Sequence, residues 1–511
     1  MLKSCILLGQ KNLLEDTSMF DERQDEALVW VQLDLDTIAH KVQTHGLIIP
    51  ICHQIEAWGI DKLLDKHVDV HQKVYDFTPN QKIIQVFASM MFGCEDNKRM
   101  NKVLREDNPQ YSRYFGLPRW ADQSVASDTF RALTAENISQ LETVFSDSLK
   151  VTGVIGDLLR QIEAGKYITI DIDLTGDVCK SIDDPTVTKG YFANKRGKTG
   201  RQKAWAYITG GSGKIQQLLA LEYGCGKMKL QHCLPKLLEK IVRLFGLENK
   251  NRRHLRKRIV IRTDAAGGTP RNIGILELFG FSYFLKGYSY QVAKQVCEKV
   301  DEWQNIPNKE GGVFGISSNP HLPNLEAFCD PVPSLEVFGF RQTKEDGKVK
   351  NSHYITNVVD YMRLSTDETT TGMWRYYHQR AGIESSIKTE RNILNTAHKR
   401  GRTFFASWGY LIVAAITYNL LYLLRSSFFS DTKQQDVGMK DFVRDAINIR
   451  CQIKTKKVRG EPIRYVSLVL DFANKYAKAF FKKVQKEATG QLLLPFSRYA
   501  DYQQSLFCLR L

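Results

Sequence analysis

The sequence lacks the cysteine patterns that build disulfide frameworks and zinc sites. Its 10 cysteines are scattered over 511 residues, with no Cys-x-x-Cys pair and no His and Cys at zinc-ligand spacing. We therefore expect reduced thiols in a cytoplasmic protein. Internal repeats and low-complexity tracts are also missing, and hydrophobic residues make up 43% of the chain. Two to four packed globular domains are expected, not a disordered chain.

Long hydrophobic runs are scarce as well. The apolar patch at the N-terminus is too short for the hydrophobic region of a signal peptide. The run 404–424 has the length needed to cross a bilayer, but it contains Ser407, Gly409, Thr417 and Asn419. We therefore expect a buried core helix there, and no membrane partner.

Positive charge, by contrast, is abundant and clustered. The net charge is +16, and basic stretches occur near 195–203, 252–258 and 454–464. One such stretch is as typical of solvated surface as of a binding site, but three together favour a polyanion. We expect nucleic acid as the partner, with candidate contacts in the first stretch at Lys195, Arg196, Lys198 and Arg201.

Hydrophobic periodicity changes along the chain from helical to strand-like near residue 165. The order that follows is three strands, a helix, a strand, a helix and a strand, ending near 286, which is the order of a ribonuclease H-like α/β core. The predicted division is 1–25 unassigned, 26–150 helical DNA-binding domain, 151–290 first part of the core, 291–370 β-rich insertion, 371–428 second part of the core with a catalytic helix, and 429–511 basic C-terminal extension.

Three acids far apart in sequence form a candidate catalytic set. Asp173 and Asp264 end predicted buried strands, and Glu384 lies on a predicted helix. On that helix Tyr377, Arg380, Glu384 and Arg391 fall at spacings that place them along one face. Carboxylates are the oxygen ligands of divalent cations, and paired cations are suited to breaking phosphodiesters. Each acid alone is weak evidence, because strand-end Asp is often a turn residue and helical Glu is usually solvated.

The first acid position has competing candidates. Asp171, Asp173 and Asp177 all lie in the stretch that begins with the first predicted core strand. Alternation cannot separate Asp171 from Asp173, because residues i and i+2 of a strand share a face. Their order of preference therefore comes from a motif.

The motifs resemble those of DDE transposases of bacterial insertion sequences. Asp173-Leu-Thr175, Arg262-Thr-Asp264 and Tyr377-x2-Arg380-x3-Glu384-x6-Arg391 are similar to the three acid motifs of the IS-four-like superfamily, with arginine in place of the last lysine. The stretch from Gly93 through Asp107, followed by Gln123-Ser124-Val-Ala-Ser127, looks like the insertion sequence thirteen-eighty family. Together the matches span residues 80 to 425.

The resemblance implies a ribonuclease H-like core with a β insertion and an N-terminal helical DNA-binding domain. It implies Mg²⁺ as cofactor, with Mn²⁺ as a substitute, held by Asp173, Asp264 and Glu384. It also implies transposition in a bacterial, nucleoid-associated setting, with double-stranded DNA as the partner (terminal inverted repeats and target DNA) and a homodimer as the active form. The spacing of Thr175 favours Asp173 as the first acid.

Candidate DNA contacts surround these acids. Tyr377, Arg380 and Arg391 are expected on phosphates near the cut, with Lys388 on the same helix. Lys286 ends the last core strand, and Trp303 is a candidate for stacking on an unpaired base or for simple packing. The alternatives to a transposase are a transposase-derived DNA-binding protein without cleavage activity and a stand-alone ribonuclease H-like DNA nuclease.

Overall fold

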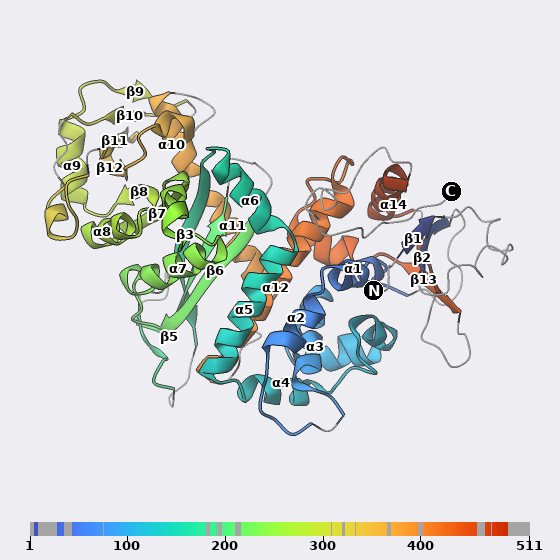
Figure 1. The fold of residues 1–511 in the computed structure, drawn as a ribbon. Helices are drawn as coiled ribbons and strands as arrows, with labels where there is room; N and C mark the ends of the chain where they lie inside the picture. Colours follow the sequence, from blue (N-terminus) through green and yellow to red (C-terminus); the bar gives the residue numbers. More distant parts are fainter. Residues whose placement is uncertain are drawn as a thin grey trace. The chain divides into compact units, whose positions relative to one another are not determined.

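The computed structural model divides the chain into two compact units (Figure 1). One comprises Met1–Val154 with Lys388–Leu511, and the other comprises Ile155–Ile387. The structure describes residues 5–8, 28–34, 43–74, 76–179, 184–190, 192, 197–209, 216–307, 309–318, 322–332, 334–364, 369–396, 401, 403–456, 465–471 and 473–488.

The unit Ile155–Ile387 is mixed α/β and is built on one mixed sheet. Its strands run in the order β4-β5-β3-β7-β8-β12-β11-β10-β9, and β6 also pairs with β5. Strands β3, β7 and β8 are parallel, whereas β5 and β6 are antiparallel to their neighbours. The bounds are β3 Ile168–Val178, β4 Thr188–Lys189, β5 Thr199–Ile208, β6 Gln217–Cys225, β7 Ile259–Gly268, β8 Ser282–Gly287, β9 Gln304–Asn305, β10 Gly312–Ile316, β11 Glu336–Thr343 and β12 Val349–Thr356.

The central strands form because their apolar runs can be buried on both faces. Ile168, Ile170 and Ile172 of β3 are at most 3% exposed, and the run Ile259–Ile261 of β7 is fully buried. Continuous β-branched runs of this kind are typical of parallel strands covered on both sides. The pairing of β3 with β7 ends at Ile172 and Thr263. The next residue on each strand is polar, Asp173 on β3 and Asp264 on β7.

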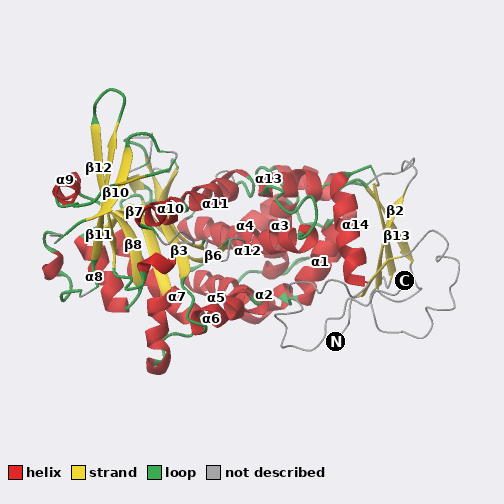
Figure 2. Cartoon of the chain, turned by 90° about the horizontal axis from the view of Figure 1, so that it is seen from above, coloured by secondary structure: helices red, strands yellow, loops and turns green. Residues whose placement is uncertain are grey.

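Helices cover both faces of this sheet (Figure 2). Helix α7 packs on β6, β5 and β7, and α8 packs on β7 and β8, while α9 packs on β11 and β12. Gly339 of β11 allows the approach of α9, because a Cβ atom there would lie 2.8 Å from Val300 Cγ2. The bounds in this unit are α6 Val154–Glu163, α7 Leu230–Leu244, α8 Pro270–Phe279, α9 Tyr290–Glu298 and α10 Thr370–His378, followed by α11 Ala381–Asn392, which runs past the boundary between the units.

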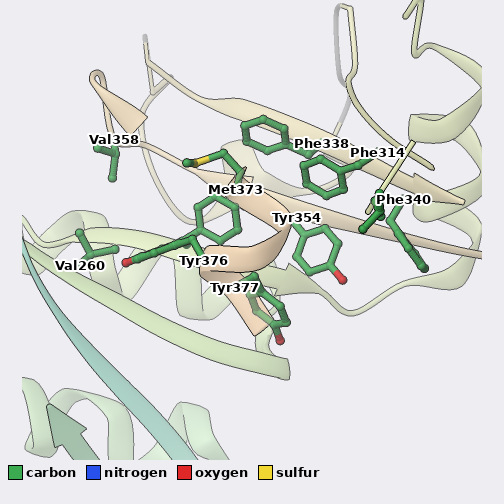
Figure 3. Close-up of a cluster of buried hydrophobic side chains, with 11 residues drawn as sticks. Val260, Phe314, Phe338, Phe340, Tyr354, Val358, Met373, Tyr376 and Tyr377 are labelled. Carbon is green, nitrogen blue, oxygen red and sulfur yellow. The ribbon is translucent and has the colours of Figure 1, made fainter. Parts of the chain in front are cut away.

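An aromatic cluster fixes α10 against the sheet (Figure 3). Tyr376 and Tyr377 of α10 meet Phe284 of β8, with ring centroids 5.5 and 6.3 Å apart respectively. The same cluster contains Val260, Ile306, Phe314, Phe338, Phe340, Tyr354, Val358 and Met373. The helix starts where Thr369 Oγ1 accepts a hydrogen bond from the amide of Gly372 at 3.1 Å. Packing and cap together hold the C-terminal end of α10 over β3 and β7.

The strands between 291 and 370 extend the main sheet. β12 pairs antiparallel with β8, with Tyr354 opposite Lys286 and Ile355 opposite Leu285. β11 and β10 continue the sheet outward. The described strands of this segment therefore share a sheet with β3, β7 and β8.

The other unit is mainly helical around α12, Phe404–Phe429. Phe130 of α4 stacks on Tyr410 of α12 at 4.0 Å, and α12 also packs on α3 and α5. This helix is long and apolar enough to cross a membrane, but 83% of its apolar window is buried in the protein. The remaining helices of the unit are α1 Ile48–Ala57, α2 Ile60–His67, α3 Pro79–Met91, α4 Gln123–Arg131, α5 Ala135–Val151, α13 Met439–Asp441 and α14 Lys475–Ala488.

A small sheet in the same unit joins segments from both ends of the sequence. Its order is β1-β2-β14-β13, with bounds β1 Cys5–Leu8, β2 Leu28–Asp34, β13 Cys451–Lys456 and β14 Tyr465–Asp471. β2 pairs parallel with β14, from Leu28 opposite Tyr465 to Asp34 opposite Asp471. The helical domain expected over 26–150 therefore begins instead with a strand at Leu28–Asp34, because a partner strand distant in sequence completes a ladder there.

Candidate active site

Asp173 and Asp264 lie where the parallel strands β3 and β7 separate. The register pairs Asp171 with Arg262 and Ile172 with Thr263, so Asp173 and Asp264 occupy the next position on each strand. Side chains alternate along a strand, which places these two carboxyl groups on one face. β3 itself continues to Val178 against β5, so Asp173 follows the last β3–β7 pair without ending its own strand.

The segment that carries the remaining candidates is two helices, not one. Helix α10 ends at His378 and α11 begins at Ala381, and the amide of Arg380 bonds to the carbonyl of Tyr377 at 3.0 Å. The expectation that one helical face carries Tyr377, Arg380, Glu384 and Arg391 is therefore wrong. Tight i to i−3 bonds and Gly382 allow the chain to break here. The break directs Arg380 towards the sheet.

Arg380 is the countercharge of Asp173. Its Nη1 lies 3.4 Å from Asp173 Oδ1, and the two side chains are 13% and 18% exposed. Burial raises the pKa of the Asp173 carboxyl to about 6, Arg380 opposes this rise, and the charges of Asp264 and Glu384 add to it. Two carboxylates therefore act on the Asp173 carboxyl group, Arg380 counters them, and burial is the main reason that its charged form is disfavoured.

The other acids are less enclosed than Asp173. Asp264 is partly buried, and its Oδ1 accepts a hydrogen bond from the amide of Ala266 at 3.0 Å. Glu384 is exposed in the first turn of α11. Lys388 and Arg391 follow it by one and two turns on the same helix, the first exposed and the second partly buried. Glu384 and these two cations are thus accessible to a solvent-borne partner.

Tyr377 anchors the helix to the strand that bears Asp264. Its hydroxyl donates to the carbonyl of Thr263 at 3.2 Å, and the residue is 6% exposed. Burial raises its pKa to about 12, so the hydroxyl stays protonated at neutral pH. The structure therefore places Tyr377 as a support for the backbone beside Asp264, not on the surface where a phosphate contact was predicted.

Asp171 is engaged below the site. Its carboxylate accepts from Arg262 Nε at 2.6 Å and Nη2 at 2.8 Å, and both side chains are fully buried. Thr209 Oγ1 donates to it as well. Asp177 lies 3.4 Å from Lys203 Nζ, and both of these side chains are also buried. Of the three acids considered for the first position, Asp173 is the one beside Asp264 and Glu384.

Several cations and rings lie around these acids, of which sequence reasoning predicted Lys286 and missed the others. Lys286, which was predicted, is partly buried near Asp264, and its pKa is lowered by burial and then by Lys350. Lys350 lies on β12, and nothing in its own sequence neighbourhood marks it. His378 is exposed and stacks on Trp374 with ring centroids 3.8 Å apart. A strand pairing, Tyr354 opposite Lys286, brings β12 beside the site.

The basic stretch near 195–203 is only partly a surface. Lys195 and Arg196 lie outside the described residues, and Lys198 is exposed. Arg201, however, is 3% exposed, with its guanidinium bound to Asp184 and to Thr186 Oγ1, the latter at 2.8 Å. The phosphate contact predicted for Arg201 is replaced by this buried ion pair, which fastens the 184–186 segment to β5.

Trp303 is partly buried and has a protein partner on one face. The guanidinium of Arg341 lies 4.8 Å from its ring centroid, and the ring edge would lie 3.3 Å from a Cβ atom at Gly339. This arrangement corresponds to the packing alternative for Trp303.

The donor set suits a hard divalent cation. Asp173, Asp264 and Glu384 supply carboxylate oxygens, which Mg²⁺ and Mn²⁺ prefer, and a cation would stabilise the charged form of Asp173 that burial and the neighbouring acids disfavour. Within the described ranges, no three His, Cys, Asp or Glu side chains are already gathered as a metal site. The acids therefore fit such an ion in chemistry, with Arg380 holding Asp173 in the meantime.

Comparison of the chain with protein-family models and with curated proteins gave no match.

Proposed function

We propose that this chain is a metal-dependent DNA transposase. It would bind terminal inverted repeats, cleave DNA phosphodiesters by two-metal hydrolysis and join 3′-hydroxyl ends to target DNA. One observation carries the proposal: Asp173 and Asp264 are next to one another where β3 and β7 part, and Glu384 and Arg380 act on the same carboxyl group.

The sheet supports the same conclusion. We take the order β6-β5-β3-β7-β8, with β3, β7 and β8 parallel and β5 and β6 antiparallel, as support for a ribonuclease H-like core. In mixed α/β sheets, sites gather towards the carboxyl ends of the parallel strands, and Asp173 and Asp264 lie on that side, just past the last β3–β7 pair. The topology and the acids therefore point to one edge of the sheet independently.

The charges of the site indicate how DNA would be held. A divalent cation on Asp173, Asp264 and Glu384 would activate the attacking oxygen and stabilise the leaving one. Lys286 and Arg380 flank these acids and would contact phosphate, as would Lys388 and Arg391 along α11. Two ends must be cut and joined together, so we expect a homodimer on DNA.

Cleavage of a DNA bearing the inverted repeats that flank the gene tests this proposal. Wild-type protein should cut and join in Mg²⁺ or Mn²⁺ and fail in EDTA. Asp264→Asn should bind the DNA with unchanged affinity and cut at least about 10³-fold more slowly, because a metal ligand is lost. Asp346→Asn, an exposed acid at the tip of the β11–β12 hairpin, is the matched control and should cut normally.

The alternatives predict other results. Sequence-specific binding without cleavage by the wild type would indicate a transposase-derived DNA-binding protein. Cutting without any joining would indicate a stand-alone nuclease. Cleavage by Asp264→Asn at the wild-type rate would show that the acids are misassigned.

A further inference from the structure

A buried polar network lies directly beneath Asp173 and Asp264. Asp171 and Arg262 are a directly opposed pair on β3 and β7, two residues before the two acids, and both are fully buried. Two hydrogen bonds, at 2.6 and 2.8 Å, join them side by side. Because the strand period is two, this ion pair shares a face with the two acids and forms the layer below them.

Two further elements close the network. Thr209, just after β5, donates to Asp171 and lies 3.3 Å from Arg262 Nη2. From α10, the carbonyl of Tyr376 accepts from Arg262 Nη1, and the Tyr376 ring lies 4.8 Å from the guanidinium. Figure 3 shows the same ring beside Val260, the β7 residue two before Arg262. The guanidinium, which is carried by β7, thus links that strand to β3, to α10 and to the end of β5.

Stability alone does not explain the presence of this buried network. A buried ion pair often contributes no more than a hydrophobic pair of the same volume, because both charges lose their hydration. What it supplies is geometry: a bidentate guanidinium–carboxylate contact fixes both partners in distance and angle. Here those partners stand one side-chain layer below the two acids whose spacing decides cation binding.

We propose that Arg262, anchored by Asp171 and Thr209, is the positioning residue that sets the spacing of Asp173 and Asp264. Asp171 is then a support, not a cation ligand. This inference rests on the proposed function for its consequence, namely a cation site of defined geometry. The positioning itself is a property of β3 and β7 and can be measured without activity.

The test compares full-length wild type with Asp171→Asn, Arg262→Lys and the milder Thr209→Val, which removes one hydroxyl and leaves the ion pair. Glu222→Gln is the matched control, because it breaks the ion pair of the buried Glu222 on β6 with the partly buried Lys240, 2.5 Å away on α7, by the same carboxylate-to-amide change. Amide hydrogen exchange of 172–175 and 264–268 reports strand position. Mn²⁺ titration by electron paramagnetic resonance reports the cation site.

Exchange at 172–175 and 264–268 should accelerate about 10-fold or more in Asp171→Asn and Arg262→Lys, and less in Thr209→Val. Mn²⁺ affinity should fall about 10–100-fold, the usual loss when an outer-shell partner is removed. Glu222→Gln should change neither quantity. If the three variants match Glu222→Gln in exchange, the inference is overturned.

The two hypotheses fail separately. Wild-type protein that binds no Mn²⁺ and cuts no DNA, combined with faster exchange in the variants, would refute the transposase and retain the positioning role. Wild-type protein that binds and cuts, with variants that keep wild-type exchange and Mn²⁺ affinity, would refute the positioning role and retain the transposase.

Discussion

Replacing Asp173 with Asn should stabilise the protein at neutral pH. Burial, together with the charges of Asp264 and Glu384, raises the pKa of Asp173 from 3.8 to about 6 despite the nearby Arg380. A raised pKa in the folded state means that folding disfavours the charged form of the acid. The pKa difference corresponds to a loss of at most about 3 kcal/mol in the free energy of unfolding. The asparagine carries no charge, so the free energy of unfolding should rise by up to about that amount.

The sign follows from linkage. The folded protein binds the proton more tightly than the unfolded chain, so the penalty is complete above pH 6 and disappears as pH falls below 3.8. The advantage of Asp173→Asn should therefore be largest near pH 8 and shrink as pH is lowered through 6 towards 4. Urea unfolding of both proteins at pH 8, 6 and 5 measures it.

Asp177→Asn is the matched control on the same strand. Its carboxylate lies 3.4 Å from the buried Lys203, so the same substitution should destabilise by about 3–5 kcal/mol, the usual effect of breaking a buried pair. Mg²⁺ should stabilise the wild type and not Asp173→Asn, because only the former keeps the ligand set. Equal destabilisation by the two substitutions at pH 8, or a pH-independent difference, would refute the account of this carboxyl group.

Two further predictions concern residues outside the acids. Arg201→Gln should lower the free energy of unfolding by about 3–5 kcal/mol in urea and leave DNA affinity unchanged, because Arg201 is buried against Asp184. Lys198→Gln, at an exposed position, should leave the free energy of unfolding unchanged and weaken DNA binding in a salt-dependent assay. Gly339→Ala should destabilise by about 1–3 kcal/mol, since its Cβ would crowd Val300 of the α9 region, whereas an unchanged urea midpoint would show that α9 can move away.

The elements of the unit Ile155–Ile387 could be predicted because burial dictates them locally. Every strand and helix expected between 165 and 286 is present, with ends shifted by a few residues. An apolar β-branched run such as Ile259–Ile261 removes its side chains from water by forming a buried strand. Helix α8 starts at Pro270, with Thr269 as its N-terminal cap. Such signals need no knowledge of distant partners.

The expectations that were wrong share one physical cause, which is a contact with a residue or strand elsewhere in the sequence. Leu28–Asp34 is a strand because Tyr465–Asp471 pairs with it. Arg201 reads as part of a basic surface, yet Asp184 arrives from a preceding loop and buries it. The break between α10 and α11 lets Arg380 reach Asp173 on β3. None of these contacts is encoded in the spacing of nearby residues.

Asp171 and Asp173 show what separates a structural acid from a candidate ligand on one strand. Both point to the same face, so alternation cannot distinguish them. The difference is their place relative to the last β3–β7 pair, Ile172 opposite Thr263. Asp171 lies before it, where β7 can offer Arg262 and α10 covers the pair, and it is fully buried. Asp173 lies beyond it, where the strand neighbour is another acid and the charge is only partly offset. The end of strand pairing, not the face, therefore decides which carboxylate remains in need of a cation.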